Sequence, residues 1–283
     1  MDNFTYPKNF IKYLGTGGAR FCMVRQMRWT GGIWFSYGGL KGVIDPGPGS
    51  LYHMCSASPA LDPHEIRAVL LTHRHLDHST DINVITEAMT GGGFEKQGTV
   101  ILPNDSINSP DPVLLRYCTD KPAQVHIAED RRIFEIGMGV SAEAVKHIHH
   151  GVDCFGFIFR KSGLPTWGII SDTKLLDSFT ERYRDCRCIS VNVTFLDKKP
   201  RLQHMSLEDL SELLEELHPE LVTISHMGVH MIEEGPEKFA SKINTPCTRV
   251  VAGRDGMVVN LDTLEIFSPL PKDREESVYT AIR

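Results

Sequence analysis

The sequence predicts an α/β protein in which two β-sheets are covered by helices. Short apolar or alternating segments, bounded by glycine and proline turns, recur in both halves of the chain, as is typical of strands. Between them lie segments whose apolar residues recur at helical spacing. Because strands dominate both halves, two sheets with intervening helices fit the pattern better than a single doubly wound sheet.

The N-terminal third is expected to hold short strands joined by turns. The stretch FIKYLGTGG ends a strand in glycines, and LKGVIDPGPG is a strand closed by an Asp-Pro-Gly turn. DPHEIRAVLLT indicates a short helix leading into a buried strand over residues 68–71, and STDINVITEAMT indicates a helix. The residues between that strand and that helix carry the chemistry described below.

The rest of the chain predicts more strands and one clear amphipathic helix. Its strand-like segments are TVILPN, RRIFEIG, AEAVKHIHH, CFGFIFR, TWGIISD and LVTIS. The helix is SLEDLSELLEELHPE, where leucines recur at helical spacing and Ser206 with Asp209 forms a capping-box-like start. The stretch RVVAGRDGMVVNL alternates around Asp255 and Gly256, which predicts a β-hairpin.

Length and composition predict one folded domain over residues 1–283, because 41% of the residues are hydrophobic and 23% are charged. The net charge of −6 shows no basic footprint for a long nucleic acid, which we therefore do not expect as a partner. The seven cysteines are scattered and form no CxxC pair, and no secretory signal or long apolar run is seen. These observations favour a cytoplasmic protein without membrane contact.

The stretch LTHRHLDHSTD, residues 71–81, concentrates metal-binding side chains directly after an apolar strand. His73 and His75 are two residues apart, so both can project on one side of an extended segment. Asp77 continues that parity, and His78 can point elsewhere as the backbone turns. Two imidazoles suit one zinc-like ion, while an aspartate and another histidine suit a second ion beside it. A polar helix entry with coincidental histidines explains this pattern less well.

The arrangement His73-x-His75-x-Asp77-His78 resembles the signature of the metallo-β-lactamase-fold hydrolases. LGTGG and VIDPGPG resemble the N-terminal motifs of the ribonuclease Z and cyclic phosphodiesterase branch of that family. HGVDCFGFIF, GIISDT and VTISHMG resemble its later motifs, so the resemblance spans nearly the whole chain. It implies a four-layer αββα sandwich, in which two mixed β-sheets are flanked by helices.

By this resemblance, two divalent metal ions share seven ligands. Zinc suits this set of nitrogen and oxygen donors, and manganese or iron would also suit it. Within HIHH, the spacing to Gly156 favours His150 over His149, which remains the alternative; Asp172 alone could also cap a helix, but it ends an apolar strand. The implied ligands are His73, His75 and His150 for one ion, Asp77, His78 and His226 for the other, and Asp172 as the bridge.

The resemblance also implies catalytic residues. His204 precedes the amphipathic helix, where the related enzymes place a histidine that assists the leaving group or the developing oxyanion; a structural role beside the helix is the alternative. Asp77 is expected to serve catalysis as well as metal binding. Asp45 is expected to orient a ligand rather than to be one, because the Pro-Gly after it already explains a turn.

The function implied is a dinuclear metal-dependent hydrolase, and specifically a phosphodiesterase in which a hydroxide that bridges the ions attacks phosphorus. Ribonuclease Z carries a long tRNA-gripping insertion between its third and fourth motifs, whereas only FIFRKSGLPTWGII separates Gly156 from Asp172 here. A small or cyclic phosphodiester is therefore favoured over pre-tRNA. The alternatives are a lactone, carboxyl-ester or thioester hydrolase, and a metal- or ligand-binding sensor without catalysis. Homodimers occur in this family, so a second copy is a further candidate partner.

Overall fold

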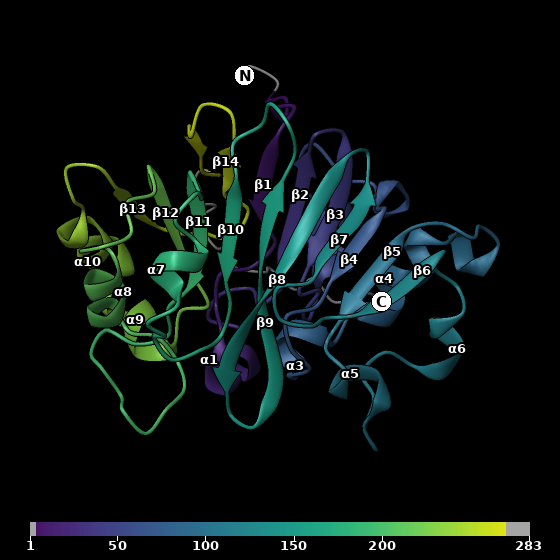
Figure 1. Ribbon diagram of the computed structural model, residues 1–283, viewed down its shortest axis with the longest axis horizontal. Coiled ribbons are helices and arrows are strands. Elements are labelled where there is room, and N and C mark those ends of the chain that lie inside the picture. Colours follow the sequence, from purple (N-terminus) through teal and green to yellow (C-terminus); the bar gives the residue numbers. More distant parts are fainter. Residues whose placement is uncertain (1–3, 270–283) are drawn as a thin grey trace, which may run out of the picture.

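Two mixed sheets lie face to face, and helices cover their outer faces (Figure 1). The computed structural model describes residues 4–269. The first sheet has eight strands in the order β15-β14-β1-β2-β3-β4-β5-β6. Its strands are β1 (Phe10–Tyr13), β2 (Ile33–Tyr37), β3 (Leu40–Ile44), β4 (Ala68–Leu70), β5 (Thr99–Leu102), β6 (Gln124–Ile127), β14 (Val258–Asn260) and β15 (Ile266–Phe267).

The second sheet has seven strands in the order β13-β12-β11-β10-β9-β8-β7. It is antiparallel from β7 to β10 and parallel from β10 to β13. Its strands are β7 (Ile133–Gly137), β8 (Val140–His149), β9 (Val152–Arg160), β10 (Trp167–Ile170), β11 (Cys188–Asn192), β12 (Leu221–Ser225) and β13 (Arg249–Ala252).

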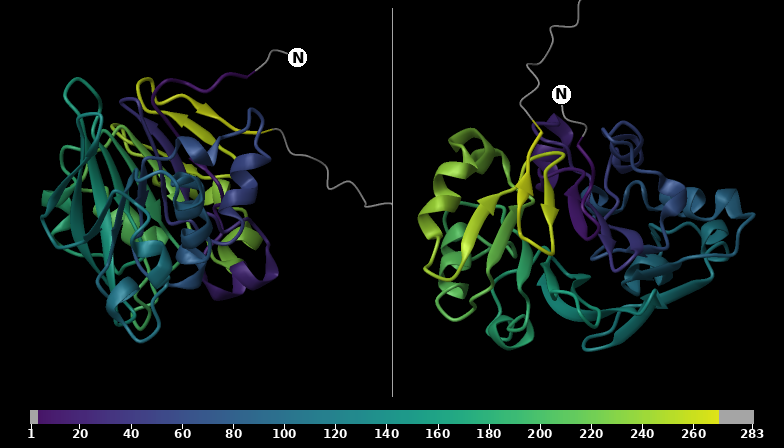
Figure 2. Two further views of the ribbon diagram at one scale, coloured as in Figure 1. Left: turned by 90° about the vertical axis from the view of Figure 1, so that its right-hand side faces the viewer. Right: turned by 90° about the horizontal axis from the view of Figure 1, so that it is seen from above.

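The helices are short and cover the face of each sheet that is turned away from the other sheet (Figure 2). No helix within residues 4–269 combines the length and apolar character needed to cross a membrane. The helices are α1 (Ala19–Arg25), α2 (Ser50–Cys55), α3 (Leu76–Ser79), α4 (Ile82–Met89), α5 (Asp105–Asn108), α6 (Arg116–Thr119), α7 (Phe179–Arg182), α8 (Leu207–Leu213), α9 (Val229–Glu234) and α10 (Pro236–Ala240).

Three apolar clusters separate these layers. The central cluster takes side chains from the facing sides of both sheets, including the stacked rings of Phe159 and Trp167, whose centroids are 4.7 Å apart. A second cluster lies between the second sheet and helices α7 to α10, and a third lies between the first sheet and helices α2 and α4. The four layers, two sheets flanked by helices, confirm the predicted α/β sandwich.

The C-terminal hairpin predicted around Asp255 and Gly256 is wrong. The strands β13 and β14 form as expected, but β13 pairs with β12 in the second sheet and β14 pairs with β1 in the first. The carboxylate of Asp255 accepts hydrogen bonds from the backbone N–H groups of Thr16 and Trp29, both at 2.9 Å. This turn is therefore tied to the loop after β1, and the chain crosses from one sheet to the other.

Strand direction brings the polar loops of the two sheets to one edge. The strands β3 and β4 of the first sheet end there, as do β8, β10, β11 and β12 of the second. The carboxyl ends of parallel strands are a common position for binding sites in α/β proteins. Every candidate metal ligand follows, or ends, one of these strands.

Helix α8 begins with the capping box that the sequence predicts. Ser206 Oγ accepts the backbone N–H of Asp209 at 3.1 Å, and the carboxylate of Asp209 accepts the backbone N–H of Ser206 at 2.8 Å. Both bonds satisfy N–H groups that the first turn of a helix leaves unpaired.

We expect Ser206→Ala to lower the free energy of unfolding by about 1 kcal/mol, because it removes the side-chain half of this box. Urea denaturation measures the change. Ser241→Ala is the control, since that exposed serine makes one long bond of 3.4 Å and should change stability by less than about 0.5 kcal/mol. Equal midpoints for the two variants would contradict the assignment.

Candidate metal centre

Three imidazoles converge on one point at the edge where the two sheets meet. His73 and His75 lie in the extended loop after β4, and His149 is the last residue of β8. Nδ1 of His75 is 3.0 Å from Nε2 of His73 and 3.1 Å from Nε2 of His149. Zinc–nitrogen bonds of 2.0–2.1 Å in a tetrahedron place ligand nitrogens about 3.3 Å apart, so this spacing fits one ion.

The other ring nitrogen of two of these histidines is held by oxygen. Nδ1 of His73 lies 3.1 Å from Oγ1 of Thr72, and Nδ1 of His149 lies 2.9 Å from the carbonyl oxygen of Gln203. Donation to these oxygens places the proton on Nδ1 and leaves the lone pair on Nε2. Both rings are therefore oriented to offer a nitrogen to a cation.

His149, and not His150, occupies the place that the sequence favoured for His150. Toward the end of β8, His147 and His149 are buried while Ile148 is exposed, so His149 points into the centre. His150 lies in the following turn with a left-handed φ of 37°, and its side chain is exposed. The spacing to Gly156 favoured His150, whereas in the structure strand β8 continues to His149 before the chain turns. The alternative that strand alternation left open is the one the structure supports.

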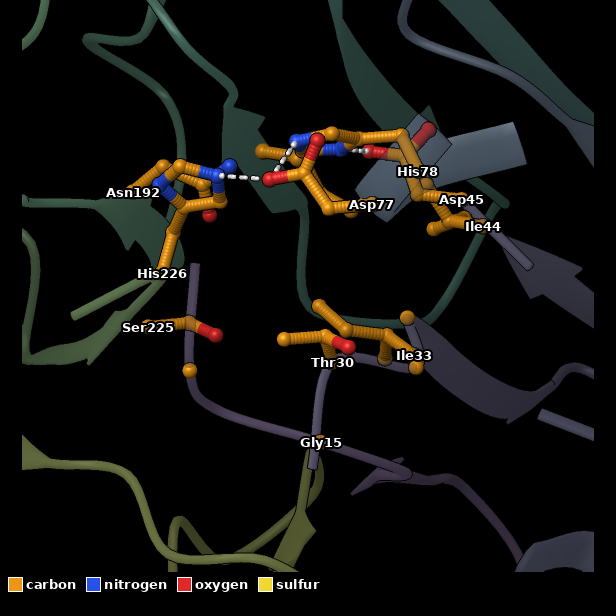
Figure 3. A pocket seen from close by; sticks show the side chains of 14 residues that line it. Gly15, Thr30, Ile33, Ile44, Asp45, Asp77, His78, Asn192, Ser225 and His226 are labelled. Carbon is orange, nitrogen blue, oxygen red and sulfur yellow. Dashed lines mark hydrogen bonds and ion pairs between the residues drawn. The ribbon is translucent and has the colours of Figure 1, made fainter. Parts of the chain in front are cut away.

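A second group forms where the loop after β4 meets the loop after β12. Oδ2 of Asp77 is 3.2 Å from Nε2 of His226, and Nε2 of His78 lies 3.8 Å from the same oxygen. Figure 3 shows these three side chains facing one another. Nε2 of His78 is buried and has no hydrogen-bond partner within residues 4–269, which a bound cation would explain.

Asp172 stands between the two groups. It follows β10, and its Oδ2 lies 3.2 Å from Nε2 of His226, 3.6 Å from Nε2 of His78 and 3.6 Å from Nε2 of His149. Its other oxygen accepts a hydrogen bond of 2.8 Å from the side-chain amide of Asn192. One carboxylate oxygen is thus shared by nitrogens of both groups, an arrangement that suits a bridge between two cations.

Asp45 orients His78, as the sequence suggested. Its Oδ2 accepts a hydrogen bond of 2.9 Å from Nδ1 of His78, and its two oxygens also accept the backbone N–H and the hydroxyl of Thr72, each at 2.7 Å. Such carboxylate–histidine pairs fix a ligand's tautomer and ring direction. Asn192, the last residue of β11, and Thr194, just after it, gave no comparable signal in the sequence, because neither residue type is a typical zinc ligand.

The glycines of LGTGG allow the chain to approach the second group closely. A Cβ on Gly18 would lie 2.1 Å from Cγ of His226, so only glycine fits against that ring. The backbone N–H of Ala19 then donates to Oδ2 of Asp77 at 3.0 Å and to Nε2 of His226 at 3.2 Å. A cavity of about 40 Å³ lies between these loops, with Thr30 on its far side, and it has room for water (Figure 3).

Four of the eight non-glycine residues with positive φ within residues 4–269 lie at or beside this site. Ala19, Asp45, His150 and His226 all have left-handed φ values between 37° and 62°, although none is a glycine. Non-glycine residues adopt this region at a cost and persist there when their surroundings hold them. Strain of this kind gathers where side chains must be aimed at a common point.

The electrostatics leave the imidazoles of the first group neutral at neutral pH. Burial lowers the pKa of His73 well below 6.5 and brings the pKa of His75 and of His149 to about 4. Burial alone would raise the pKa of Asp172, but the neighbouring His226, His78 and His204 outweigh it and hold that pKa well below its usual value. Neutral imidazoles and an ionised carboxylate are the forms that bind metal ions.

His204 lies at the rim of the centre, just before α8. Its Nδ1 is 3.5 Å from Oδ2 of Asp172, its side chain is 12% exposed, and its ring centroid lies 5.2 Å from that of the exposed His150. Burial lowers the pKa of His204 to about 4. The structure thus brings His204 beside the candidate ligands without placing it among the shortest contacts.

Comparison with known proteins identifies the family. Residues 42–227 match the description "Beta-lactamase superfamily domain". The chain belongs to this superfamily. An uncharacterized protein of Methanocaldococcus jannaschii is 29% identical over 260 residues, which cover 89% of this chain and 94% of the relative.

Solved structures of superfamily proteins confirm the fold. The metallo-β-lactamase fold protein YhfI of Bacillus subtilis superimposes with a TM-score of 0.71 at 17% identity, covering 88% of this chain and 98% of that one. A diphosphatase of the PhnP family gives 0.64 at 16% identity, covering 89% and 96%. The short form of human tRNase Z gives 0.66 at 14% identity, covering 89% and 99%. The metallo-β-lactamase fold predicted from the HxHxDH motif is therefore confirmed, and the neighbours include hydrolases.

Substituting the two adjacent histidines separates the alternatives at the end of β8. We expect His149→Ala to lose about one equivalent of bound zinc, because it removes one of three converging nitrogens, while His150→Ala keeps the zinc of the unaltered protein. Elemental analysis after dialysis measures both. Retention by His149→Ala together with loss by His150→Ala would reverse the assignment.

The metal-free protein should lose stability as the pH falls. His75, His149 and His204 have a pKa of about 4 in the folded chain against 6.5 ordinarily, and His147 has one of about 3. Between these values the unfolded chain binds more protons, so protonation favours unfolding. The pKa values of His73, His53 and His126 are lowered by burial too and act in the same sense. His78, whose pKa is raised by Asp77, Asp45 and Asp172 against the effect of burial, acts in the opposite sense but is a single group.

We expect the thermal midpoint of the metal-free protein to fall by about 5–10 °C from about pH 7 to about pH 5. Circular dichroism melts measure it, and zinc-loaded protein is the reference, since nitrogens bound to zinc resist protonation. A midpoint that stays constant or rises would show that the buried histidines titrate otherwise.

Proposed function

We propose that the protein is a dinuclear metal-dependent hydrolase that acts on small or cyclic phosphodiesters. The observation that carries this proposal is Oδ2 of Asp172, which lies within 3.6 Å of ligand nitrogens from both groups. A carboxylate oxygen shared between two groups of candidate ligands supports two cations side by side.

The donors would divide between the ions according to their convergence. His73, His75 and His149 would hold the first ion, Asp77, His78 and His226 the second, with Asp172 between them. The set contains nitrogen and oxygen and no thiolate, which suits zinc, with manganese or iron as alternatives. When bound, the two ions would supply a nucleophile from water at neutral pH and offset the charge that develops on the phosphoryl group.

His204 would stabilise the reacting phosphoryl group from the rim. With a pKa near 4 its imidazole is neutral at pH 7, so it can donate one hydrogen bond to an oxygen that gains negative charge. Asp77 would contribute through its place between His226 and the backbone N–H of Ala19, which fixes its carboxylate.

The absence of a tRNA-gripping arm in the third-to-fourth motif connection supports a small substrate. Only residues 161–166 link β9 to β10. This connection is the place where, by the sequence resemblance, ribonuclease Z carries its long insertion. The net charge of −6 would repel an extended polyanion. Phosphoryl-cleaving neighbours, the diphosphatase and tRNase Z, share the fold and agree with a phosphoester bond.

We expect the zinc-loaded protein to hydrolyse a chromogenic phosphodiester, and a chelator to abolish that turnover. His204→Ala should keep its zinc but lower kcat about 100-fold, because it removes a donor to the developing charge. His218→Ala, at an exposed histidine beyond α8, is the matched control and should match the unaltered protein.

The same assay with a lactone and a thioester distinguishes the other chemistries. Rapid opening of the lactone without phosphodiester turnover would contradict the phosphodiesterase and indicate an ester hydrolase. Full zinc loading with no turnover of any substrate would indicate a binding protein instead.

A further inference from the structure

The hydroxyl of Thr194 lies between two histidines of the centre. Its Oγ1 is 3.0 Å from Nδ1 of His226 and 3.1 Å from Nδ1 of His204, and Thr194 is buried. Its backbone is fixed as well, since its N–H donates to the carbonyl of Met205 at 3.0 Å and its carbonyl accepts the N–H of Gly228 at 3.1 Å. Thr194 therefore contacts the segments that carry both histidines.

The proton on His226 can be located from its neighbours. Nε2 of His226 accepts the backbone N–H of Ala19 at 3.2 Å, and it is the atom that His226 would offer to a cation, so its lone pair points into the centre. A neutral imidazole carries one N–H, which must then be on Nδ1. His226 therefore donates to the oxygen of Thr194.

The hydroxyl of Thr194 has one proton of its own, and its partner follows from that. With His226 donating to Oγ1, the acceptor within reach is Nδ1 of His204. A protonated Nδ1 on His204 would leave the buried hydroxyl proton without an acceptor within residues 4–269, which is unfavourable. The chain of donation runs from His226 through Thr194 to His204.

We propose that Thr194 is a positioning residue that holds His204 in the tautomer with its proton on Nε2. Oδ2 of Asp172, 3.5 Å from Nδ1, would otherwise attract a proton to that nitrogen. The inference rests on the proposed function, because only the Nε2–H tautomer presents a donor at the ring edge opposite Thr194. The other tautomer would present a lone pair, which repels a phosphoryl oxygen.

Long-range nitrogen–proton NMR of protein with isotope-labelled histidine tests this without substrate. The His204 signals are assigned by their loss in His204→Ala, in zinc-loaded and in metal-free protein. We expect Nε2–H in the unaltered protein and in Thr194→Ser, and Nδ1–H or a mixture in Thr194→Val. Thr86→Val is the matched control, since it removes another buried hydroxyl, which donates to the carbonyl of Ile82 in α4.

Kinetics supply the second readout. We expect Thr194→Val to lower kcat for the phosphodiester at least about tenfold with KM changed less than about twofold, and Thr194→Ser to stay within about threefold, with zinc content unchanged in both. If Thr194→Val does not fold, Thr194→Ala replaces it.

The two proposals fail differently. An Nδ1–H tautomer of His204 in the unaltered protein, or an unchanged tautomer in Thr194→Val, overturns the role of Thr194 whatever the turnover. A tautomer that shifts as expected in a protein that cleaves no phosphodiester upholds Thr194 and overturns the phosphodiesterase.

Discussion

The carboxylate of Asp172 is the interaction on which the rest of the centre depends. It is buried, and it faces three imidazoles that arrive on different loops, one from the first sheet and two from the second. Taking a carboxylate out of water is costly unless it is paired and hydrogen-bonded. Here the imidazoles and the amide of Asn192 supply that compensation, so neither the charge nor the cluster would be favourable alone.

Around this carboxylate the surrounding residues act by fixing direction. Asp45 holds His78, Thr72 holds His73, and the carbonyl of Gln203 holds His149. The left-handed backbone at Asp45 and His226 shows that the chain accepts local strain to aim these groups. Orientation by such outer contacts raises the basicity of a ligand and selects its tautomer.

The fold and most of the centre could be predicted because their signals are local. Side chains alternate along an extended segment, so the two-residue spacing put His73 and His75 on the same side of it. Asp172 and His226 were indicated by their positions after apolar strands. The structure places His149 rather than His150 beside His73 and His75. The residue at which this strand ends depends on its pairing with β9, which no local pattern reveals.

Other features were beyond the sequence for related reasons. The segment of RVVAGRDGMVVNL has the alternation and the turn of a hairpin, yet long-range hydrogen bonds of Asp255 send its two strands to different sheets. Helix α1 is only seven residues long, which is too short for helical periodicity to predict it. Nothing in the sequence distinguishes Thr194 from other threonines. Its proposed role follows from its contacts with the imidazole rings of His204 and His226.

The candidate ligands come from both layers of the sandwich, and that origin has a consequence for how the protein matures. The first sheet carries His73, His75, Asp77 and His78, and the second sheet carries His149, Asp172 and His226. Cations that bind only the assembled arrangement stabilise it by mass action. Each bound ion would link the two sheets across their interface. The metal supply during synthesis would therefore influence how much of the protein reaches and keeps the folded state.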